Sequence, residues 1–389
     1  MNIDTAKLCQ PIWNSSIVYY EAAVFDEKHK SLRLIYPADE ILEVCSGDFK
    51  KIYIKNKDYR LENGAVVFTE ASDIPIASGD TVIIDNKVEH TDVITDKILG
   101  EANYYYLNDH EGLRLIYDNE YLERCVLITY RHSLCYKDGY LNTPVSYYGS
   151  GLGKFAERLH AGKHINYLIY GDSAMCGASA SGAEVNYCLY NNECELMASK
   201  QGLGGKVPPM FELFADEMKR KYGSDYTIFN ISQGGKTSLW GEKSIKERIN
   251  IKGCFENGIP DVAIIGFFAN DFGSQKFTEV GYYESIKFIV KFLKSEFEDI
   301  SIILLTGYPC NDRCVRYNNP KRETEISNSL KKISNEFDDI MCIDTLGALR
   351  NMLSGKRQCE YLSNNINHGG DFMQCLWAQT VCACFDNKD

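Results

Sequence analysis

A serine in the middle of the chain has the surroundings of an enzyme nucleophile. Ser173 follows an apolar run that ends at Tyr170, in the order Tyr170-Gly171-Asp172-Ser173. Gly171 allows the backbone to turn sharply after a strand, and the Ser173 amide can donate to an oxyanion that develops beside its own hydroxyl. Taken alone, Gly-Asp-Ser is common and more often marks only a turn, so other residues must decide the interpretation.

Two further segments supply hydrogen-bond donors of the kind that an oxyanion needs. Gly235 follows a second apolar run, and Asn270 follows a third. The Gly235 backbone amide and the Asn270 side-chain amide are neutral donors, and the Ser173 amide would complete a three-donor oxyanion hole. Each donor is worth about 3 kcal/mol in a transition state. The simpler interpretations, a tight turn at Gly235 and a helix cap at Asn270, stay open.

A serine hydroxyl is a poor nucleophile at neutral pH, and an adjacent imidazole is the usual base that activates it. The chain has seven histidines, four of them in the β-rich first half. His160 and His164 lie at the amino end of the strand that precedes Ser173. Only His368 lies in a loop after the last expected strand, on the same side as Ser173. We therefore predict His368 as the base, although a lone histidine is more often structural.

Strands and amphipathic helices alternate from about residue 160 onward. The expected strands are 164–170, 226–231, 261–267, 301–307 and 341–344. The segments between these strands have apolar residues at helical spacing. Gly223 is the expected C-terminal cap of the helix that precedes the second strand. The alternation predicts an α/β fold with a five-stranded parallel sheet, covered on both faces, whose carboxyl edge carries the ligand site.

The first part of the chain has a different pattern, in which short expected strands are separated by turns. Its expected strands are 32–36, 51–54, 65–68, 81–84 and 126–130. They are rich in β-branched and aromatic residues, and turn signals such as Asn63-Gly64 separate them. We therefore expect an all-β sandwich domain over residues 1–150 and the α/β domain over residues 151–389, joined by the glycine-rich stretch 136–162.

These motifs, in this order, resemble the conserved blocks of the SGNH (GDSL) hydrolase superfamily over roughly residues 160–389. By that resemblance Ser173 is the nucleophile and His368 is the base. Gly235 and Asn270 match the oxyanion donors of the second and third blocks. The family implies a flavodoxin-like, three-layer α/β/α domain. A β-rich region ahead of it also resembles two-domain carbohydrate esterases, in which a jelly-roll module precedes the hydrolase.

Two positions depart from the family pattern. Phe268 stands where the third block has glycine, which is expected to reshape the pocket floor without removing the Asn270 amide. Asn365 stands where the last block has aspartate. Its carbonyl can fix the imidazole tautomer but offers no negative charge to an imidazolium. We therefore expect a Ser-His dyad with Asn365 as a neutral orienter. Asp371 is the alternative acid, although a charge in the first turn of a helix fits it better.

The remaining candidates concern ligands. Trp240 and Phe268 are possible substrate contacts, and Trp240 could stack on a sugar ring or belong to the core. We expect no metal, because the cysteine pairs lack zinc spacing and nearby histidines. We expect no cofactor, because the glycines and lysine at 202–206 are not in phosphate-loop register after a strand.

Composition narrows the partners and the location. The 389-residue chain carries a formal net charge of -12 without a long run of one sign, which argues against nucleic acid and anionic membranes as partners. Its 15 cysteines, an odd number, are expected to be mostly buried thiols. The first residues lack a signal-peptide pattern, so a cytoplasmic location is expected unless a leader was removed. The oligomeric state does not follow from the sequence.

The favoured function is hydrolysis of a short acyl ester, such as an acetyl group on a carbohydrate or another small molecule. One alternative is a lysophospholipase- or thioesterase-like lipase acting on longer chains. Another, from a different class, is a carbohydrate-binding protein on an inactive hydrolase scaffold. The departures at Phe268 and Asn365 favour the inactive scaffold, whereas the four retained motif residues favour the enzyme.

Overall fold

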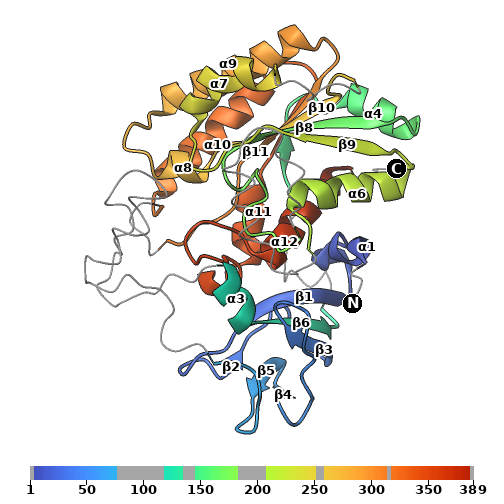
Figure 1. Cartoon of the computed structure of the whole chain (residues 1–389), viewed down its shortest axis with the longest axis vertical. Helices are drawn as coiled ribbons and strands as arrows, with labels where there is room; N and C mark the ends of the chain where they lie inside the picture. Colours follow the sequence, from blue (N-terminus) through green and yellow to red (C-terminus); the bar gives the residue numbers. More distant parts are fainter. Residues whose placement is uncertain are drawn as a thin grey trace.

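The computed structural model describes residues 4–76, 118–134, 145–182, 207–250, 258–312 and 317–385, and Figure 1 shows the course of the chain. The elements before residue 145 are α1 (Thr5–Leu8), η1 (Ile12–Asn14), β1 (Ile17–Val24), β2 (Ser31–Leu32), β3 (Glu40–Ser46), β4 (Tyr59–Glu62), β5 (Ala65–Phe68), α3 (Asp118–Arg124) and β6 (Cys125–Arg131). Those that follow, up to the strand β10, are β7 (Tyr147–Tyr148), α4 (Gly153–His160), β8 (Ile165–Gly171), α6 (Met210–Tyr222), β9 (Tyr226–Asn230), α7 (Ser238–Ile249) and β10 (Val262–Gly266). The last are α8 (Ala269–Phe272), α9 (Glu279–Glu296), β11 (Ser301–Leu305), α10 (Pro320–Ser334), β12 (Ile340–Ile343), α11 (Thr345–Met352), η4 (Gln358–Glu360), α12 (Asp371–Cys382) and η5 (Ala383–Phe385).

A six-stranded sheet with the order β7-β12-β11-β10-β8-β9 forms the centre of the second half. The five expected strands are all present, and they run parallel to one another. The prediction of a purely parallel, five-stranded sheet nevertheless needs correction, because β7 pairs antiparallel with β12 at the edge. With only two residues, β7 is too short to produce a pattern, and it lies with α4 in the stretch that we expected to be a linker.

Helices cover both faces of this sheet. Figure 1 shows α7, α9 and α10 above it and α6, α11 and α12 below it, which makes three layers. The strands β10, β11 and β12 are buried along their whole length, as apolar strands between two helical layers must be. The helix α12 is also buried throughout, so it packs between the sheet and the N-terminal half rather than at the surface.

Local signals set the ends of several helices. Gly223 ends α6 in the left-handed conformation, with φ of 73°, which confirms the predicted C-terminal cap. Thr278 caps α9 by accepting from the Gly281 amide, and Asn319 caps α10 by accepting from the Arg322 amide. These caps depend on neighbouring residues only, so the sequence pattern is enough to locate them.

The N-terminal half is simpler than the predicted sandwich. Its described strands form two antiparallel, three-stranded sheets, β1-β6-β3 and β2-β5-β4. Asn63 and Gly64, both with positive φ, form the predicted two-residue turn between β4 and β5. The expected strand 51–54 makes only an isolated bridge at Ile52, and 81–84 lies outside the described residues. A jelly roll, which has about eight strands, is therefore not confirmed.

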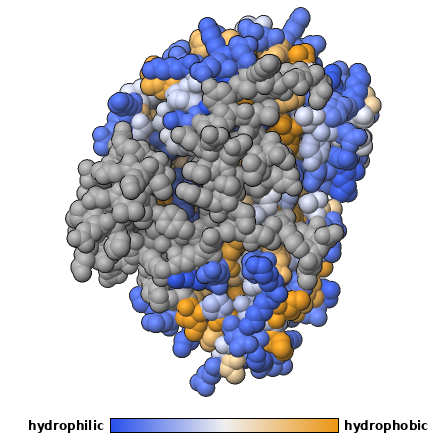
Figure 2. All heavy atoms as spheres, viewed as in Figure 1, coloured by the Kyte–Doolittle hydropathy of each residue, from blue (hydrophilic) through white to orange (hydrophobic). Residues whose placement is uncertain are grey.

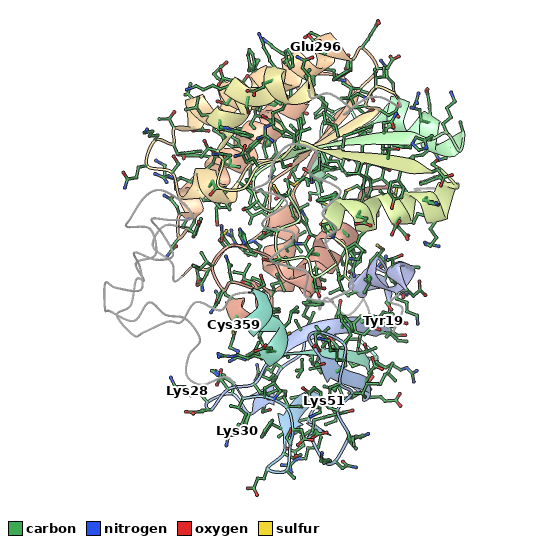
Figure 3. All side chains as sticks on the ribbon, viewed as in Figure 1. Tyr19, Lys28, Lys30, Lys51, Glu296 and Cys359 are labelled. Carbon is green, nitrogen blue, oxygen red and sulfur yellow. The ribbon has the colours of Figure 1, made fainter. Side chains whose placement is uncertain are left out.

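The two halves are packed against each other. One cluster of buried apolar side chains runs through both. The Gln379 side chain on α12 accepts from the Ile12 amide and donates to the Leu8 carbonyl, at 3.1 and 2.8 Å. Elsewhere between the two halves, the Lys356 ammonium lies 2.9 Å from a Glu21 carboxylate oxygen. Figure 3 labels Cys359, three residues after Lys356 in the chain. The division at residue 150 stays a prediction.

Figure 2 shows how hydrophilic and hydrophobic side chains of the described residues are distributed on one face. Hydrophilic side chains predominate at the top of the molecule, over α7 and α9, among a few hydrophobic ones, and further hydrophobic side chains are scattered at the lower end. Exposed apolar residues of the N-terminal half include Leu42, Ile52 and Ile54. Within the described ranges, no helix is both long and apolar enough to span a membrane.

Candidate active site

The carboxyl edge of the sheet brings Ser173 and His368 together. Ser173 lies two residues beyond the end of β8, and His368 lies in the loop before α12. The His368 Nε2 atom is 3.0 Å from Ser173 Oγ, which is hydrogen-bond distance. An imidazole with an unprotonated Nε2 can accept the hydroxyl proton from there. Ser173 is only 4% exposed, whereas the His368 side chain is partly exposed.

Gly171 is required at the end of β8 by close packing. A Cβ atom there would lie 2.0 Å from the Gly266 carbonyl oxygen and 2.4 Å from Met175 Cγ. Any larger residue would therefore push β8 away from β10. The reason for glycine two residues before Ser173 is thus the close approach of a neighbouring strand. The φ of Gly171 is not positive, so the turn does not by itself require glycine there.

The Asp172 carboxylate connects the loop that carries Ser173 to α8. It is completely buried and accepts hydrogen bonds from the Ala174 amide at 3.0 Å and the Phe268 amide at 3.4 Å. Burial raises the pKa of Asp172 to about 7, and these backbone hydrogen bonds act in the opposite direction. Asp172 therefore satisfies loop amides and positions Ser173 relative to Asn270.

The Asp271 carboxylate connects α8 to α7 in a similar way. Its two carboxylate oxygens accept from the Ser238 amide at 2.9 Å and from the Ser238 hydroxyl at 2.8 Å. Burial raises the pKa of Asp271 to about 7 as well, and the nearby Asp172 adds to this rise. The contact fixes the start of α7, and with it the preceding loop that carries Gly235.

The predicted oxyanion donors lie on loops that these contacts hold together. Gly235 has a φ of 73°, a conformation that favours glycine. The Asn270 side-chain amide donates to the Lys236 carbonyl at 3.2 Å, and its second N–H group can serve another acceptor. The buried Arg248 guanidinium donates to the Ile231 carbonyl at 3.0 Å and so holds the other end of the Gly235 loop. The oxyanion assignments themselves stay predictions.

A side-chain oxygen organises the loop that carries His368. Asn364 Oδ1 accepts from the backbone amides of Ile366, Asn367 and His368, at 3.0, 3.0 and 2.9 Å. One oxygen that binds several successive amides makes a compact turn, which is a common role of asparagine in loops. The backbone of His368 is therefore fixed relative to Asn364.

Asn365 is bound by a residue that the sequence did not indicate. It adopts a φ of 55°, and the Asn311 side-chain amide donates to its backbone oxygen at 2.6 Å and to its Oδ1 at 3.2 Å. The Asn365 side-chain carbonyl thus has a partner other than the imidazole. Its role as orienter of His368 stays a prediction.

Asp371 lies in the first turn of α12, as expected. Its carboxylate accepts from the Ser181 amide at 2.8 Å and from the Ser181 hydroxyl at 2.6 Å. It therefore connects α12 to the segment that follows the nucleophile. These bonds give the carboxylate a positioning role in the fold. The alternative that Asp371 is the acid of a triad stays a prediction.

Of the two predicted substrate contacts, Phe268 needs correction. Its ring is 0% exposed and packs edge to face against Tyr308 and Trp377, so it belongs to the core and does not face a substrate. Trp240 is half-buried, next to Tyr170 and under the Arg248 guanidinium, 4.7 Å from the ring centroid. Its stacking on a sugar stays a prediction.

Several supporting residues were missed by the sequence analysis, namely Tyr308, Asn311, Arg248 and Asn364. Asn364 had a signal, because an asparagine at the start of a polar loop is typical of such turns. The other three had none, since each contacts a segment distant in sequence. In the described part of the chain, no group of three or more His, Cys, Asp or Glu side chains is placed to hold a metal ion.

Comparison with known proteins finds similarity only among solved structures, since no family model and no curated protein matches the chain. A lipase from a goat rumen metagenome is 14% identical, with 58% of this chain and 99% of that chain covered and a TM-score of 0.39. The lipase/acylhydrolase from Enterococcus faecalis is 16% identical, with 56% and 93% covered and a TM-score of 0.38. A catalytic mutant of an acetylxylan esterase from Geobacillus stearothermophilus is 13% identical, with 57% and 95% covered and a TM-score of 0.40. TM-scores of this size carry no argument about function by themselves.

Proposed function

We propose that this protein is a serine ester hydrolase of the SGNH type, in which His368 activates Ser173. The observation that carries the proposal is the 3.0 Å contact between His368 Nε2 and Ser173 Oγ at the carboxyl edge of the sheet. Ligands bind at this edge in open α/β sheets. The motif order of Ser173, Gly235, Asn270 and His368, which resembles the SGNH superfamily, supports the same conclusion.

The reaction has two halves. As Ser173 Oγ attacks the ester carbonyl, His368 takes the hydroxyl proton, and it then gives that proton to the departing alcohol. Water next attacks the acyl-serine, His368 takes a proton from it, and the proton returns to Ser173 as the carboxylic acid leaves. The amides of Ser173, Gly235 and Asn270 would hold the oxyanion in both halves.

A short acyl group, such as acetyl, on a carbohydrate or another small molecule is the proposed substrate. Its support is the resemblance in sequence architecture, a β-rich region ahead of the hydrolase motifs, to two-domain carbohydrate esterases. The position of Trp240, half-buried on α7 shortly after the Gly235 loop, supports it as well. A lipase that acts on longer acyl chains is the alternative within hydrolases, and the chain-length test below separates the two.

The test measures release of p-nitrophenol from acetate, butyrate and octanoate esters by three proteins. Ser173→Ala should lower kcat by a factor of roughly 1000 or more, because loss of the nucleophile removes the covalent route. Ser295→Ala, which removes an exposed hydroxyl on α9, should hydrolyse acetate as fast as the wild type. Equal, slow rates for wild type and Ser173→Ala would reject the hydrolase and favour a binding protein on an inactive scaffold. Preference for octanoate would reject only the short acyl group.

A further inference from the structure

One buried hydroxyl holds the backbone on both sides of His368. We propose that Tyr308 is a positioning residue for His368, acting through the loop backbone rather than on the substrate. The proposal rests on the proposed function, in which His368 is the base.

The two contacts of the Tyr308 hydroxyl enclose a single residue. It donates to the Asn367 carbonyl at 3.0 Å and accepts from the Gly369 amide at 3.1 Å. A phenol can make both bonds at once, because it carries one donor and acceptor lone pairs. Since these groups belong to the residues before and after His368, the hydroxyl restrains the backbone from which the imidazole projects.

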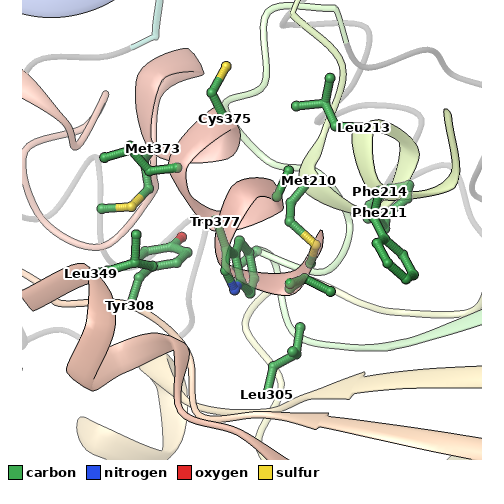
Figure 4. Packing of buried hydrophobic residues seen from close by; sticks show 14 of the residues in the cluster. Met210, Phe211, Leu213, Phe214, Leu305, Tyr308, Leu349, Met373, Cys375 and Trp377 are labelled. Carbon is green, nitrogen blue, oxygen red and sulfur yellow. The ribbon is translucent and has the colours of Figure 1, made fainter. Parts of the chain in front are cut away.

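Tyr308 is itself held firmly. Its ring is 0% exposed, and ring centroids of Phe268 and Trp377 lie 5.1 and 5.0 Å away, both nearly perpendicular to it. Figure 4 shows Tyr308 beside Trp377, close to α12. Burial raises the pKa of Tyr308 well above its usual value, so the phenol stays neutral and can donate. A rigid ring therefore carries the hydroxyl to the loop.

This packing gives a reason for Phe268 at the position where related motifs have glycine. Gly307, with a φ of 95°, leaves space that the Phe268 ring fills, since a Cβ on Gly307 would lie 2.5 Å from Phe268 Cγ. The ring thus lies against the residue next to Tyr308 and against Tyr308 itself. The two departures from the SGNH pattern, Phe268 and Asn365, are connected through this segment.

A second attachment comes from the same segment after β11. The Asn311 amide donates to the Ile366 carbonyl at 2.7 Å, and the Asn311 side chain donates to the Asn365 carbonyl at 2.6 Å. The usual aspartate before the histidine would orient the ring through its charge. Here Tyr308 and Asn311 hold the backbone instead, and a displacement of the base by about 1 Å can cost a factor of about 100 in rate.

The first measurement compares Tyr308→Phe with Tyr222→Phe. The control loses a hydroxyl that also donates to a backbone carbonyl, at Phe385, which lies beyond the opposite end of α12 from the His368 loop. Tyr308→Phe should lower kcat about 10-fold with KM within about a factor of two, because binding is kept while the base is misplaced. Tyr222→Phe should keep the wild-type kcat. A wild-type kcat for Tyr308→Phe would overturn the proposal.

The second measurement does not require that the protein hydrolyse esters. Imidazole nitrogen signals of His368 are recorded by NMR and assigned by their absence in His368→Gln. They should shift in Ser173→Ala, which removes the hydroxyl partner, and shift or broaden in Tyr308→Phe but not in Tyr222→Phe. If the wild type shows no esterase activity, the proposed function fails while this readout still decides the positioning role. Unchanged His368 signals in Tyr308→Phe would overturn it.

If near-UV circular dichroism shows that Tyr308→Phe does not fold, Phe268→Leu replaces it. This variant keeps the Tyr308 hydroxyl but loosens the packing of its ring. It should lower kcat in the same direction, leave KM unchanged and shift the His368 signals. A folded Phe268→Leu protein with wild-type kcat and signals would contradict the positioning role.

Discussion

Ser173 and His368 are close to each other in space, although 195 residues of chain separate them. Each is placed by a neighbouring polar side chain that does not itself react. Asp172 binds amides of its own loop and of α8, and Asn364 binds three successive amides up to His368. At the scale of single residues, the site therefore depends on carboxylate and amide oxygens that bind backbone rather than substrate.

The relative importance of His368 and Asn365 can be measured directly. His368→Ala should lower kcat/KM by a factor of roughly 10,000 or more, because in the proposed mechanism His368 takes the serine proton. Asn365→Ala should cost only about 10-fold, since the Asn365 carbonyl is neutral and Asn311 also holds the loop through the Ile366 carbonyl. Steady-state kinetics with p-nitrophenyl acetate give both values. Comparable losses would show that Asn365 contributes as much as a carboxylate would.

At the scale of elements, the short helix α8 connects the loop that carries Ser173 to α7. Asn270 on α8 contacts the loop before α7, and Asp271 on α8 contacts the first residue of α7. The Phe268 amide, just before α8, donates to Asp172. Phe268 anchors this helix in the core. A change in α8 should therefore affect both stability and the geometry of the site.

Phe268→Ala tests the anchor. Removal of a fully buried phenylalanine ring should lower the free energy of unfolding by about 3–5 kcal/mol, through lost burial and a cavity beside Tyr308. Urea unfolding followed by tryptophan fluorescence measures the change. Phe288→Ala on α9, where the side chain is 37% exposed, should cost much less. Similar losses for the two variants would contradict the packing described here.

The buried carboxyls Asp172 and Asp271 make stability depend on pH. Burial raises the pKa of both carboxyls to about 7 from the ordinary aspartate value of 3.8. Between those values the folded protein binds more protons than the unfolded chain, so stability should fall as pH rises from about 4 to about 7 and change little above that.

Asp271→Asn should flatten this decline, because the amide does not ionise and can still accept from Ser238. Thermal unfolding between pH 4 and pH 8 measures it. Glu296→Gln, on the surface at the top of Figure 3, should give a curve parallel to that of the wild type. An Asp271→Asn curve with the wild-type slope would show that Asp271 does not ionise in this range.

At the scale of the whole molecule, the N-terminal half and the α/β half meet through buried charge as well as apolar contact. The Lys356 ammonium, 1% exposed, lies 2.9 Å from Glu21 on β1 and 3.7 Å from Glu360. Arg357 also donates to the Val24 carbonyl and to Asp26. These contacts hold the N-terminal half and the α/β half in one arrangement, because a buried charge that loses its partner costs free energy.

Lys356→Met should lower the free energy of unfolding by about 3–5 kcal/mol, because it leaves the Glu21 carboxylate buried without its cation. The double variant Lys356→Met with Glu21→Gln should recover part of that loss, since both charges are then gone. Lys154→Met, which breaks an exposed pair with Asp299, is the control and should change little. Urea unfolding gives all three values. A double variant less stable than Lys356→Met would exclude the buried pair as the cause.

The sequence by itself determined the features that depend on near neighbours. The five apolar runs became the five parallel strands, Gly223 ended α6, and Asn63-Gly64 formed a hairpin turn. Periodicity, capping and turn conformation act over a few residues, so the pattern records them. The order of Ser173 and His368 among these elements was enough to place both at one edge of the sheet.

Only the tertiary structure decided the features that depend on distant segments. The edge strand β7 exists because β12 offers it hydrogen bonds, and Phe268 is core because Gly307 leaves it room. Tyr308 reaches the Gly369 amide across 61 positions of chain, and Asn311 takes up the Asn365 carbonyl across 54. Such contacts arise when packed strands and helices bring unrelated loops together, and no local pattern of residue types encodes them.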